Sequence, residues 1–165
     1  MQARTSFGDQ TDRLLDRAGQ ACDRRGSRLT DIRRHVLGLV LESDTPTGAY
    51  ELLDRLRSSH KGAAPPTVYR ALEFLLAQGL IHKVERLSAF VGCVHEVPGI
   101  PSDAHHHHGA QFLICQRCGR TIELDDEEIG QALTGAAKRA GFLLHRATVE
   151  IEGVCATCTQ AGNPG

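Results

Sequence analysis

Two Cys-x-x-Cys pairs restrict the fold of this 165-residue chain more than any other feature. The first pair is Cys115 and Cys118, and the second is Cys155 and Cys158. Four thiolates complete the tetrahedral ligand set of a closed structural zinc site, and the two-residue spacer lets both sulfurs of a pair reach one ion from a tight turn. Residues 119–154, 36 in all, separate the pairs. Because this gap is longer than the usual zinc-ribbon spacing, we expect a helix and a strand inside the zinc loop.

Disulfide bonds and a thioredoxin-like redox motif are two other uses of such cysteines. We expect no disulfides, because the sequence shows no signal peptide and thiols stay reduced in the cytosol. A thioredoxin-like motif needs one Cys-x-x-Cys beside a βαβ pattern, whereas here two pairs occur without that pattern. The absence of a long apolar run also predicts a soluble protein that does not enter a membrane. The cysteines therefore predict a cytoplasmic protein with structural zinc.

Apolar periodicity predicts four helices and a hairpin in the first half of the chain. The helices are expected at residues 11–25, 31–43, 49–57 and 67–78, and the strands at residues 81–85 and 89–93. Thr30 and Thr47 are the expected N-caps of the second and third helices, and Cys22 is expected on the buried face of the first. A short helix, a turn and a second helix with polar side chains at its start form a helix-turn-helix, and the hairpin is the wing of a winged helix.

Basic and polar side chains near these helices are candidates for contacts with double-stranded DNA. Thr67, Tyr69 and Arg70 stand at the start of the fourth helix, where Arg70 can reach guanine or a phosphate and Tyr69 a thymine methyl or a backbone oxygen. Arg28 belongs to a group of arginines at the entrance to the second helix. Residues 1–84 carry a net charge of +3 and residues 85–165 a net charge of −4. This division suggests a polyanion-binding module joined to a second part of different function.

The second half of the chain predicts a small α+β arrangement. The segment 94–103 contains Pro98, Gly99 and Pro101 without periodicity and is expected to be a linker. Strands are expected at residues 112–115, 121–124 and 144–151, with a helix that Asp125 or Asp126 caps and that runs to about residue 140. The tail, residues 159–165, is expected to be frayed.

The order of these motifs resembles the ferric uptake regulator family. PPTVYRALEFLLAQGLIHKVE is followed by a hairpin, a histidine-rich linker, FLICQRCG and a distal CATC, and the resemblance spans residues 29–158. Within the family it looks most like the zinc uptake regulator branch. The resemblance implies a dimeric repressor that binds palindromic, AT-rich operators of zinc-uptake genes when it is loaded with zinc. It also implies a two-domain α/β protein: a winged helix-turn-helix domain at 1–92, a hinge linker at 93–104, and an α+β dimerisation domain with structural zinc at 105–165.

A second, regulatory zinc site is also implied by the resemblance, which makes two zinc ions per subunit. Its ligands would be His82, Cys93, His108 and Glu123. Such a Cys/His₂/Glu set suits Zn²⁺, whereas iron and manganese sensors favour nitrogen and oxygen ligands throughout. Spacing favours His108 within the run 105–108, with His95 and Asp103 as the nearest substitutes. A surface role for His82, a packing role for Cys93 and a polar strand position for Glu123 are the alternatives. The family often has a further metal site near position 147, but the histidines here are out of register for it.

Several other functions remain as alternatives to zinc-dependent repression. A regulator of the same family could sense iron, manganese, nickel or peroxide. A zinc deaminase needs His-x-Glu and Pro-Cys-x-x-Cys, but here His95 and Glu96 are adjacent and Ile114 precedes Cys115. A catalytic zinc also keeps an open coordination position, whereas four protein ligands are available at each site here. We therefore expect that the protein is not an enzyme and has no small-molecule substrate. The last alternative is a redox sensor that uses Cys115, Cys118, Cys155 and Cys158 as thiols.

Overall fold

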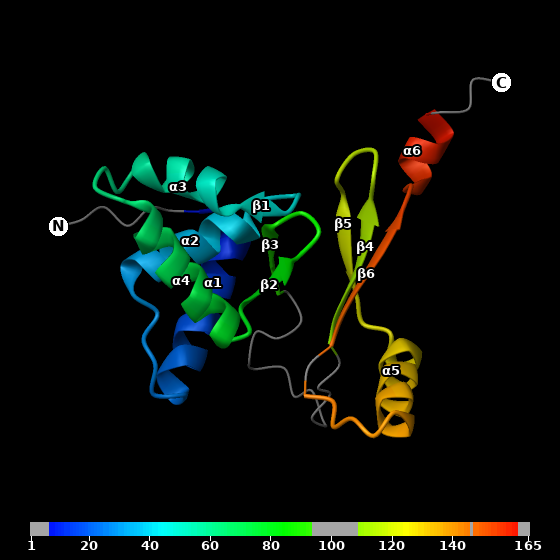
Figure 1. Ribbon diagram of the computed structural model, residues 1–165. Helices are drawn as coiled ribbons and strands as arrows, with labels where there is room; N and C mark the ends of the chain where they lie inside the picture. The colour runs from blue at the N-terminus through cyan, green and yellow to red at the C-terminus, as the bar shows by residue number, and fades with distance from the viewer. Residues whose placement is uncertain (1–6, 94–108, 146, 162–165) are drawn as a thin grey trace. The chain divides into compact units, whose positions relative to one another are not determined.

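The computed structural model describes residues 7–93, 109–145 and 147–161. The chain divides into two compact units, Met1–Pro101 and Ser102–Gly165, and each is described by itself (Figure 1). Most of the expected hinge at 93–104 lies outside the described residues, so the predicted domain bounds stay a prediction. Among the described residues, no helix combines the length and the apolar character that crossing a membrane requires.

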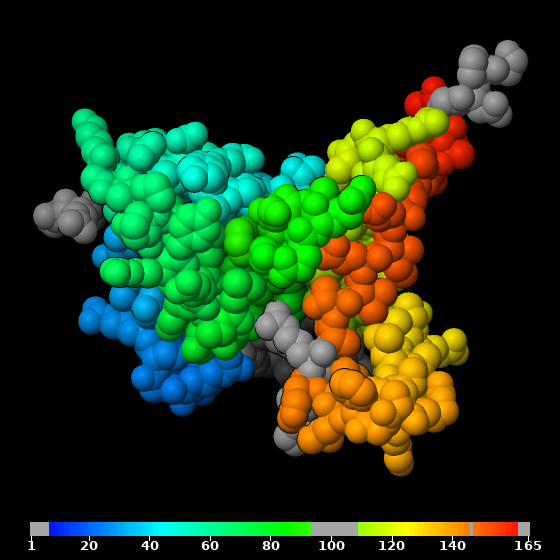
Figure 2. Space-filling model, viewed as in Figure 1, coloured from blue at the N-terminus to red at the C-terminus, as the bar shows by residue number. Residues whose placement is uncertain are grey.

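The N-terminal unit contains helices and a small antiparallel sheet in the predicted order. Its elements are α1 (Asp9–Arg24), α2 (Asp31–Leu41), β1 (Thr47–Gly48), α3 (Ala49–Arg57), α4 (Pro65–Ala77), β2 (Ile81–Val84) and β3 (Ala89–Gly92). The sheet order is β1-β3-β2, with both pairings antiparallel. The turn of the hairpin, residues 85–88, is exposed, and the hairpin is seen in bright green at the surface in Figure 2. The four predicted helices and the wing hairpin are confirmed.

One apolar core holds the helices of this unit together. It includes Leu15, Val36, Leu52, Leu56, Val68, Leu72 and Leu75, which are almost completely buried. Cys22 belongs to the same core, as predicted. Gly79 ends α4 with a φ of +70°, a conformation that favours glycine, and the N–H of Leu80 then bonds to the carbonyl of Leu75 at 3.0 Å. This ending turns the chain directly from α4 into the wing.

The predicted cap at Thr47 is wrong. Thr47 is buried in β1, where it pairs with Phe90, and its hydroxyl donates to the carbonyl of Thr45 at 3.2 Å. Gly48 takes the N-cap position of α3 instead. A β-branched residue suits an extended, half-buried strand, so pairing with the wing overrides the local capping preference. Thr30 does occupy the N-cap position of α2, without a capping hydrogen bond from its side chain.

The C-terminal unit is a three-stranded sheet with a helix at each end of the sheet (Figure 1). Its elements are β4 (Ala110–Cys115), β5 (Thr121–Leu124), α5 (Glu127–Arg139), β6 (Thr148–Gly153) and α6 (Ala156–Ala161). The strand order is β5-β4-β6, where β5 is antiparallel and β6 parallel to β4. The carboxylate of Asp126 accepts the N–H of Ile129 at 3.1 Å and caps α5, as predicted.

Two predictions for this unit are wrong. The last strand starts at Thr148 rather than residue 144, because its pairing begins where β4 begins, with Ala110 opposite Thr148. Part of the tail expected to be frayed forms α6, which extends through Ala161. A helix of six residues is too short to show apolar periodicity in the sequence. The strand, helix and strand expected between the cysteine pairs are confirmed as β5, α5 and β6.

Candidate metal centre and DNA-binding surface

The four paired cysteines lie at one end of the C-terminal sheet. Cys115 ends β4, and Cys118 lies in the turn to β5, which Gly119 completes with a φ of +72°. Cys155 follows β6, and its carbonyl accepts the N–H of Thr159 at 2.9 Å at the start of α6. Because β4 and β6 are parallel neighbours, with Cys115 opposite Gly153, both pairs emerge at the same end of the sheet. Pairs far apart in sequence are thereby placed side by side.

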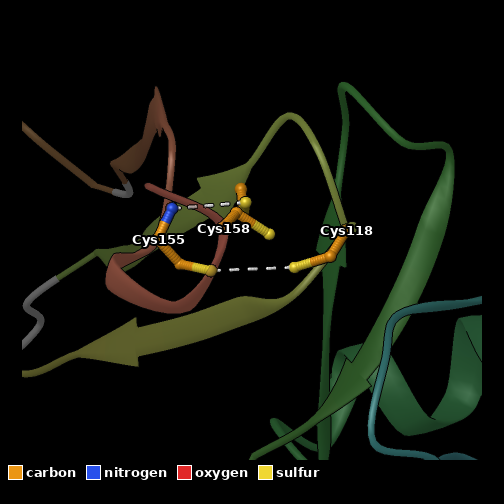
Figure 3. Close-up of side chains that lie close together, drawn as sticks. Cys118, Cys155 and Cys158 are labelled. Carbon is orange, nitrogen blue, oxygen red and sulfur yellow. Dashed lines mark hydrogen bonds between the residues drawn. The ribbon is translucent and has the colours of Figure 1, made fainter. Parts of the chain in front are cut away.

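The distances between these sulfurs fit a tetrahedral zinc ion. All four ligand atoms lie within 4.8 Å of one another, and the sulfurs of Cys118 and Cys155 are 3.8 Å apart. Four Zn–S bonds of about 2.3 Å in a tetrahedron place the sulfurs about 3.8 Å from each other. In Figure 3 the sulfurs of Cys118, Cys155 and Cys158 point toward a common region. The geometry therefore suits a closed, four-thiolate zinc site.

The electrostatics of the cluster favour a cation between the sulfurs. The N–H of Cys155 donates to the sulfur of Cys115 at 3.3 Å. This bond, followed by the N–H of Cys118, lowers the pKa of Cys115 to about 6 by stabilising its thiolate. Hydrogen bonds with the sulfurs of Cys155 and Cys118 favour the protonated form of Cys158 and raise its pKa to about 12. A divalent cation that displaces the remaining protons would bond all four sulfurs.

Two of the four predicted regulatory ligands lie together on the wing. His82 is in β2, and Cys93 directly follows β3, where its N–H donates to the carbonyl of Leu80 at 3.1 Å. A ring nitrogen of His82 lies within 4.8 Å of the sulfur of Cys93. Glu123 is half-buried in β5 of the other unit, opposite Phe112. His108 lies outside the described residues, as do His95, Asp103 and residues 105–107.

The start of α4 presents polar side chains opposite its buried face. Tyr69 is 45% exposed, Arg70 is exposed and Thr67 is half-buried, whereas Val68 and Leu72 are buried. Among the described residues, Arg70 has no hydrogen-bond or ion-pair partner. Helix α4 therefore offers its first two turns to a ligand, as the winged-helix prediction requires.

Two further side chains near this surface are exposed. Arg28 lies in the loop between α1 and α2, as predicted, and its side chain has no partner among the residues described. Tyr50, in the first turn of α3, is 71% exposed and was not singled out from the sequence. The sequence could have indicated its exposure, because Tyr50 falls outside the apolar spacing of Leu52, Leu53 and Leu56, which form the buried edge of α3. An exposed tyrosine there lies on the first helix of the helix-turn-helix, which crosses the DNA backbone in this class of domain.

Comparisons with known proteins show which family the chain resembles. The ferric uptake regulator family model matches residues 24–152. The zinc uptake regulation protein of Escherichia coli K12 is 41% identical over 150 residues, which cover 91% of this chain and 84% of the relative. The zinc uptake regulation protein of Mycobacterium tuberculosis H37Rv is 33% identical over 136 residues, covering 81% of this chain and 95% of the relative.

Solved structures give the same result. A zinc uptake regulator complexed with zinc and DNA is 40% identical, with a TM-score of 0.82, and the match covers 92% of this chain and 96% of that one. Holo XcZur is 43% identical, with a TM-score of 0.77, covering 90% and 99% of the two chains. The chain belongs to the ferric uptake regulator family, in its zinc uptake regulator branch. The predicted resemblance and fold class are thus confirmed.

Proposed function

We propose that this protein is a zinc-responsive transcriptional repressor that binds palindromic, AT-rich operators of zinc-uptake genes in the cytoplasm. The observation that carries the proposal is the similarity of almost the whole chain to a zinc uptake regulator complexed with zinc and DNA. The relatives are regulators, and the four cysteines would fill every position of a tetrahedral ion. Both points favour a regulator over an enzyme.

Structural zinc at Cys115, Cys118, Cys155 and Cys158 is the first part of the proposal. The sulfur spacing supports it, as does the N–H of Cys155 that donates to a ligand sulfur. When bound, the ion would offset part of the negative charge of the four thiolates and join the ends of β4 and β6. At this end of the sheet Cys118 is exposed, and Cys155 and Cys158 are only partly buried. Zinc would cross-link the two cysteine pairs where three of the four side chains are open to solvent.

A regulatory zinc at His82, Cys93, His108 and Glu123 is the second part. The juxtaposition of His82 and Cys93 on the wing supports it. The wing continues directly from α4 through Gly79, so a ligand that orders the wing also acts on the element that reads DNA. Since Glu123 belongs to the other unit, one ion bound by all four ligands would restrict the relative motion of the units. A residue set divided in this way suits a switch better than a structural site.

A homodimer formed through the C-terminal unit is the third part. Ile122, Leu113 and Ile151 are cross-strand neighbours on β5, β4 and β6 and form one apolar row. They are 41%, 37% and 39% exposed. Such a row on one face of a sheet is a typical interface between protein chains. Two subunits would present two copies of α4, which a palindromic operator requires.

Zinc-dependent DNA binding tests the proposal directly. A duplex selected from a randomised library with the zinc-loaded protein would be titrated at a series of free Zn²⁺, Fe²⁺ and Mn²⁺ concentrations. We expect Zn²⁺ to induce binding at the lowest free concentration, and operator DNA to tighten zinc binding by the same factor, because the coupling is reciprocal. Induction by Fe²⁺ or Mn²⁺ at lower concentrations would assign the protein to another metal.

Substitutions in α4 test which helix reads the DNA. Tyr69→Ala and Arg70→Ala should each weaken operator binding by about 1–3 kcal/mol per half-site without changing zinc content. Lys138→Ala, at an exposed cation of α5, is the control for the loss of one positive charge. Operator affinity equal to that of the wild type in both α4 variants would contradict the assignment.

A further inference from the structure

The loop between α1 and α2 is fastened to α4 at two points. We call residues 25–30 of this loop the arginine loop. The first point is Gln78, at the C-cap of α4. Arg25 Nη1 donates to the carbonyl oxygen of Gln78 at 2.9 Å, and the hydroxyl of Ser27 bonds to its side-chain oxygen at 3.1 Å. These bonds attach the start of the arginine loop to the end of the helix.

The second point is a contact between Arg33 and Phe74. The guanidinium carbon of Arg33 lies 3.7 Å from the centre of the Phe74 ring, a cation–π contact. Arg33 Nη1 also donates to the carbonyl oxygen of Arg28 at 2.7 Å. Phe74 itself packs against the apolar core. Arg33 therefore connects the backbone of the arginine loop to a side chain that the core holds in place.

The two attachment points lie on the same side of α4 as Arg70, the residue proposed to contact DNA bases. Arg70, Phe74 and Gln78 are spaced four residues apart, so they lie along one side of α4. The spacing corresponds to about 6 Å per step along the helix axis. Arg28 is thus held beside the side of α4 that carries Arg70, while its own side chain is exposed and has no partner among the described residues.

We propose that Arg33 is a positioning residue for DNA binding: stacked on Phe74 and bonded to the carbonyl of Arg28, it holds Arg28 where its side chain meets the DNA backbone when Arg70 enters the groove. The inference rests on the proposed DNA-binding function and adds a specific role to it. Arginine is needed at position 33 because a planar guanidinium can stack on a ring and donate in its own plane at once, whereas an ammonium group does not combine these two geometries.

Charge-preserving substitutions separate this role from a general electrostatic one. Arg33→Lys keeps the positive charge but removes the stacked guanidinium. Arg34→Lys is the matched control, since Arg34 is adjacent on α2 but pairs with Asp16 at 2.8 Å. Phe74→Leu removes the ring from the other side and keeps an apolar side chain. Zinc content and circular dichroism of each variant would establish that it is folded and loaded.

The measurement is the affinity for the selected duplex as a function of salt concentration. The slope of log K against log salt decreases in magnitude by about 0.9 for each phosphate that the protein no longer neutralises. A homodimer loses one such contact at each half-site, so the slope should decrease by about 1.8, which makes the fall of affinity between 50 and 200 mM salt about twelvefold smaller. We expect this reduced slope in Arg28→Ala, in Arg33→Lys and in Phe74→Leu, but not in Arg34→Lys. In the Arg28→Ala background, Arg33→Lys should have no further effect, because the side chain that it positions is already absent.

Three results would overturn the inference. One is an Arg33→Lys protein with the same slope as Arg34→Lys. Another is a full additional effect of Arg33→Lys in the Arg28→Ala background, which would indicate a general structural role. The third is the absence of zinc-dependent DNA binding by the wild-type protein, which would remove the proposed function itself. The first two leave the proposed function intact.

Discussion

Replacing Gly38 by alanine should destabilise the N-terminal unit, although alanine is normally the better helix residue. Gly38 lies in α2 under the ring of Phe7. An added Cβ would overlap Cε2 and Cζ of that ring and lie 2.8 Å from its Cδ2. Ordinary contacts between carbons are about 3.5–4.0 Å, so the ring must move away. The ring also makes an edge contact with His35, at 5.5 Å between centroids, which the movement would break.

The balance of these effects decides whether Gly38→Ala raises or lowers the free energy of unfolding. Glycine to alanine inside a helix gains about 0.8–1.0 kcal/mol. Displacing the half-buried Phe7 ring costs about 1 kcal/mol of apolar burial, and breaking the aromatic contact costs about 1 kcal/mol more. Gly38→Ala should therefore lower the free energy of unfolding by about 1 kcal/mol. Gly19→Ala in α1, where an added Cβ meets nothing within 4 Å, should raise it by about 1 kcal/mol.

Urea unfolding of the zinc-loaded protein, followed by circular dichroism, measures both changes. A double-mutant cycle with Phe7→Ala completes the test. In the Phe7→Ala background the clash is absent, so Gly38→Ala should stabilise the unit as Gly19→Ala does. If Gly38→Ala increases stability while Phe7 is present, the packing of this ring on α2 is not as described.

Three further predictions concern metal and protons. Cys118→Ser should lose one zinc ion per chain and with it the dimer, since structural zinc supplies on the order of 10 kcal/mol in small domains; unchanged metal content by atomic absorption would contradict the site. Cys93→Ser should keep the structural zinc and the dimer but lose zinc-induced operator binding, and a normal response in a binding titration would place the sensor elsewhere. Burial, followed by the charge of His60, lowers the pKa of His35 below its usual 6.5. Just below pH 6.5 the unfolded chain therefore binds more protons than the folded chain, and the free energy of unfolding should fall as the pH decreases through this range. In His35→Leu the free energy of unfolding, measured with urea, should fall less over the same range. An equal fall in this variant would assign the pH dependence to other groups.

Local signals were enough to predict most of the N-terminal unit. The apolar spacing of Leu52, Leu53 and Leu56, and of Val68, Leu72 and Leu75, follows the helical period, and all six are buried. Strand β1 could not be predicted in this way, because two residues have no period. It exists because β3 offers partners for pairing, and such a partner is a tertiary feature. The same reason explains why Thr47 is a strand residue and not a cap.

The candidate sites also differ in whether a local sequence pattern or a tertiary contact defines them. Each Cys-x-x-Cys pair carries its ligand spacing in the sequence, and the parallel pairing of β4 with β6 then brings the two pairs together. His82 and Cys93 have no such local pattern, and their proximity depends on the hairpin register that pairs Ile81 with Gly92. The attachment of Arg33 to Phe74 joins helices far apart in sequence, so helical periodicity gave no sign of it.

Because β4 and β6 pair in parallel, zinc bound by the four cysteines would also test the register of these two strands. Cys115 lies opposite Gly153, two residues before Cys155. A slip of one residue would move β6 by about 3.3 Å along its neighbour and turn its side chains to the other face. The thiolates of the two pairs could then no longer surround one ion with bonds of about 2.3 Å. Tight zinc binding at these cysteines would therefore select a single alignment of the sheet, and a metal-loaded chain would also be a correctly paired one.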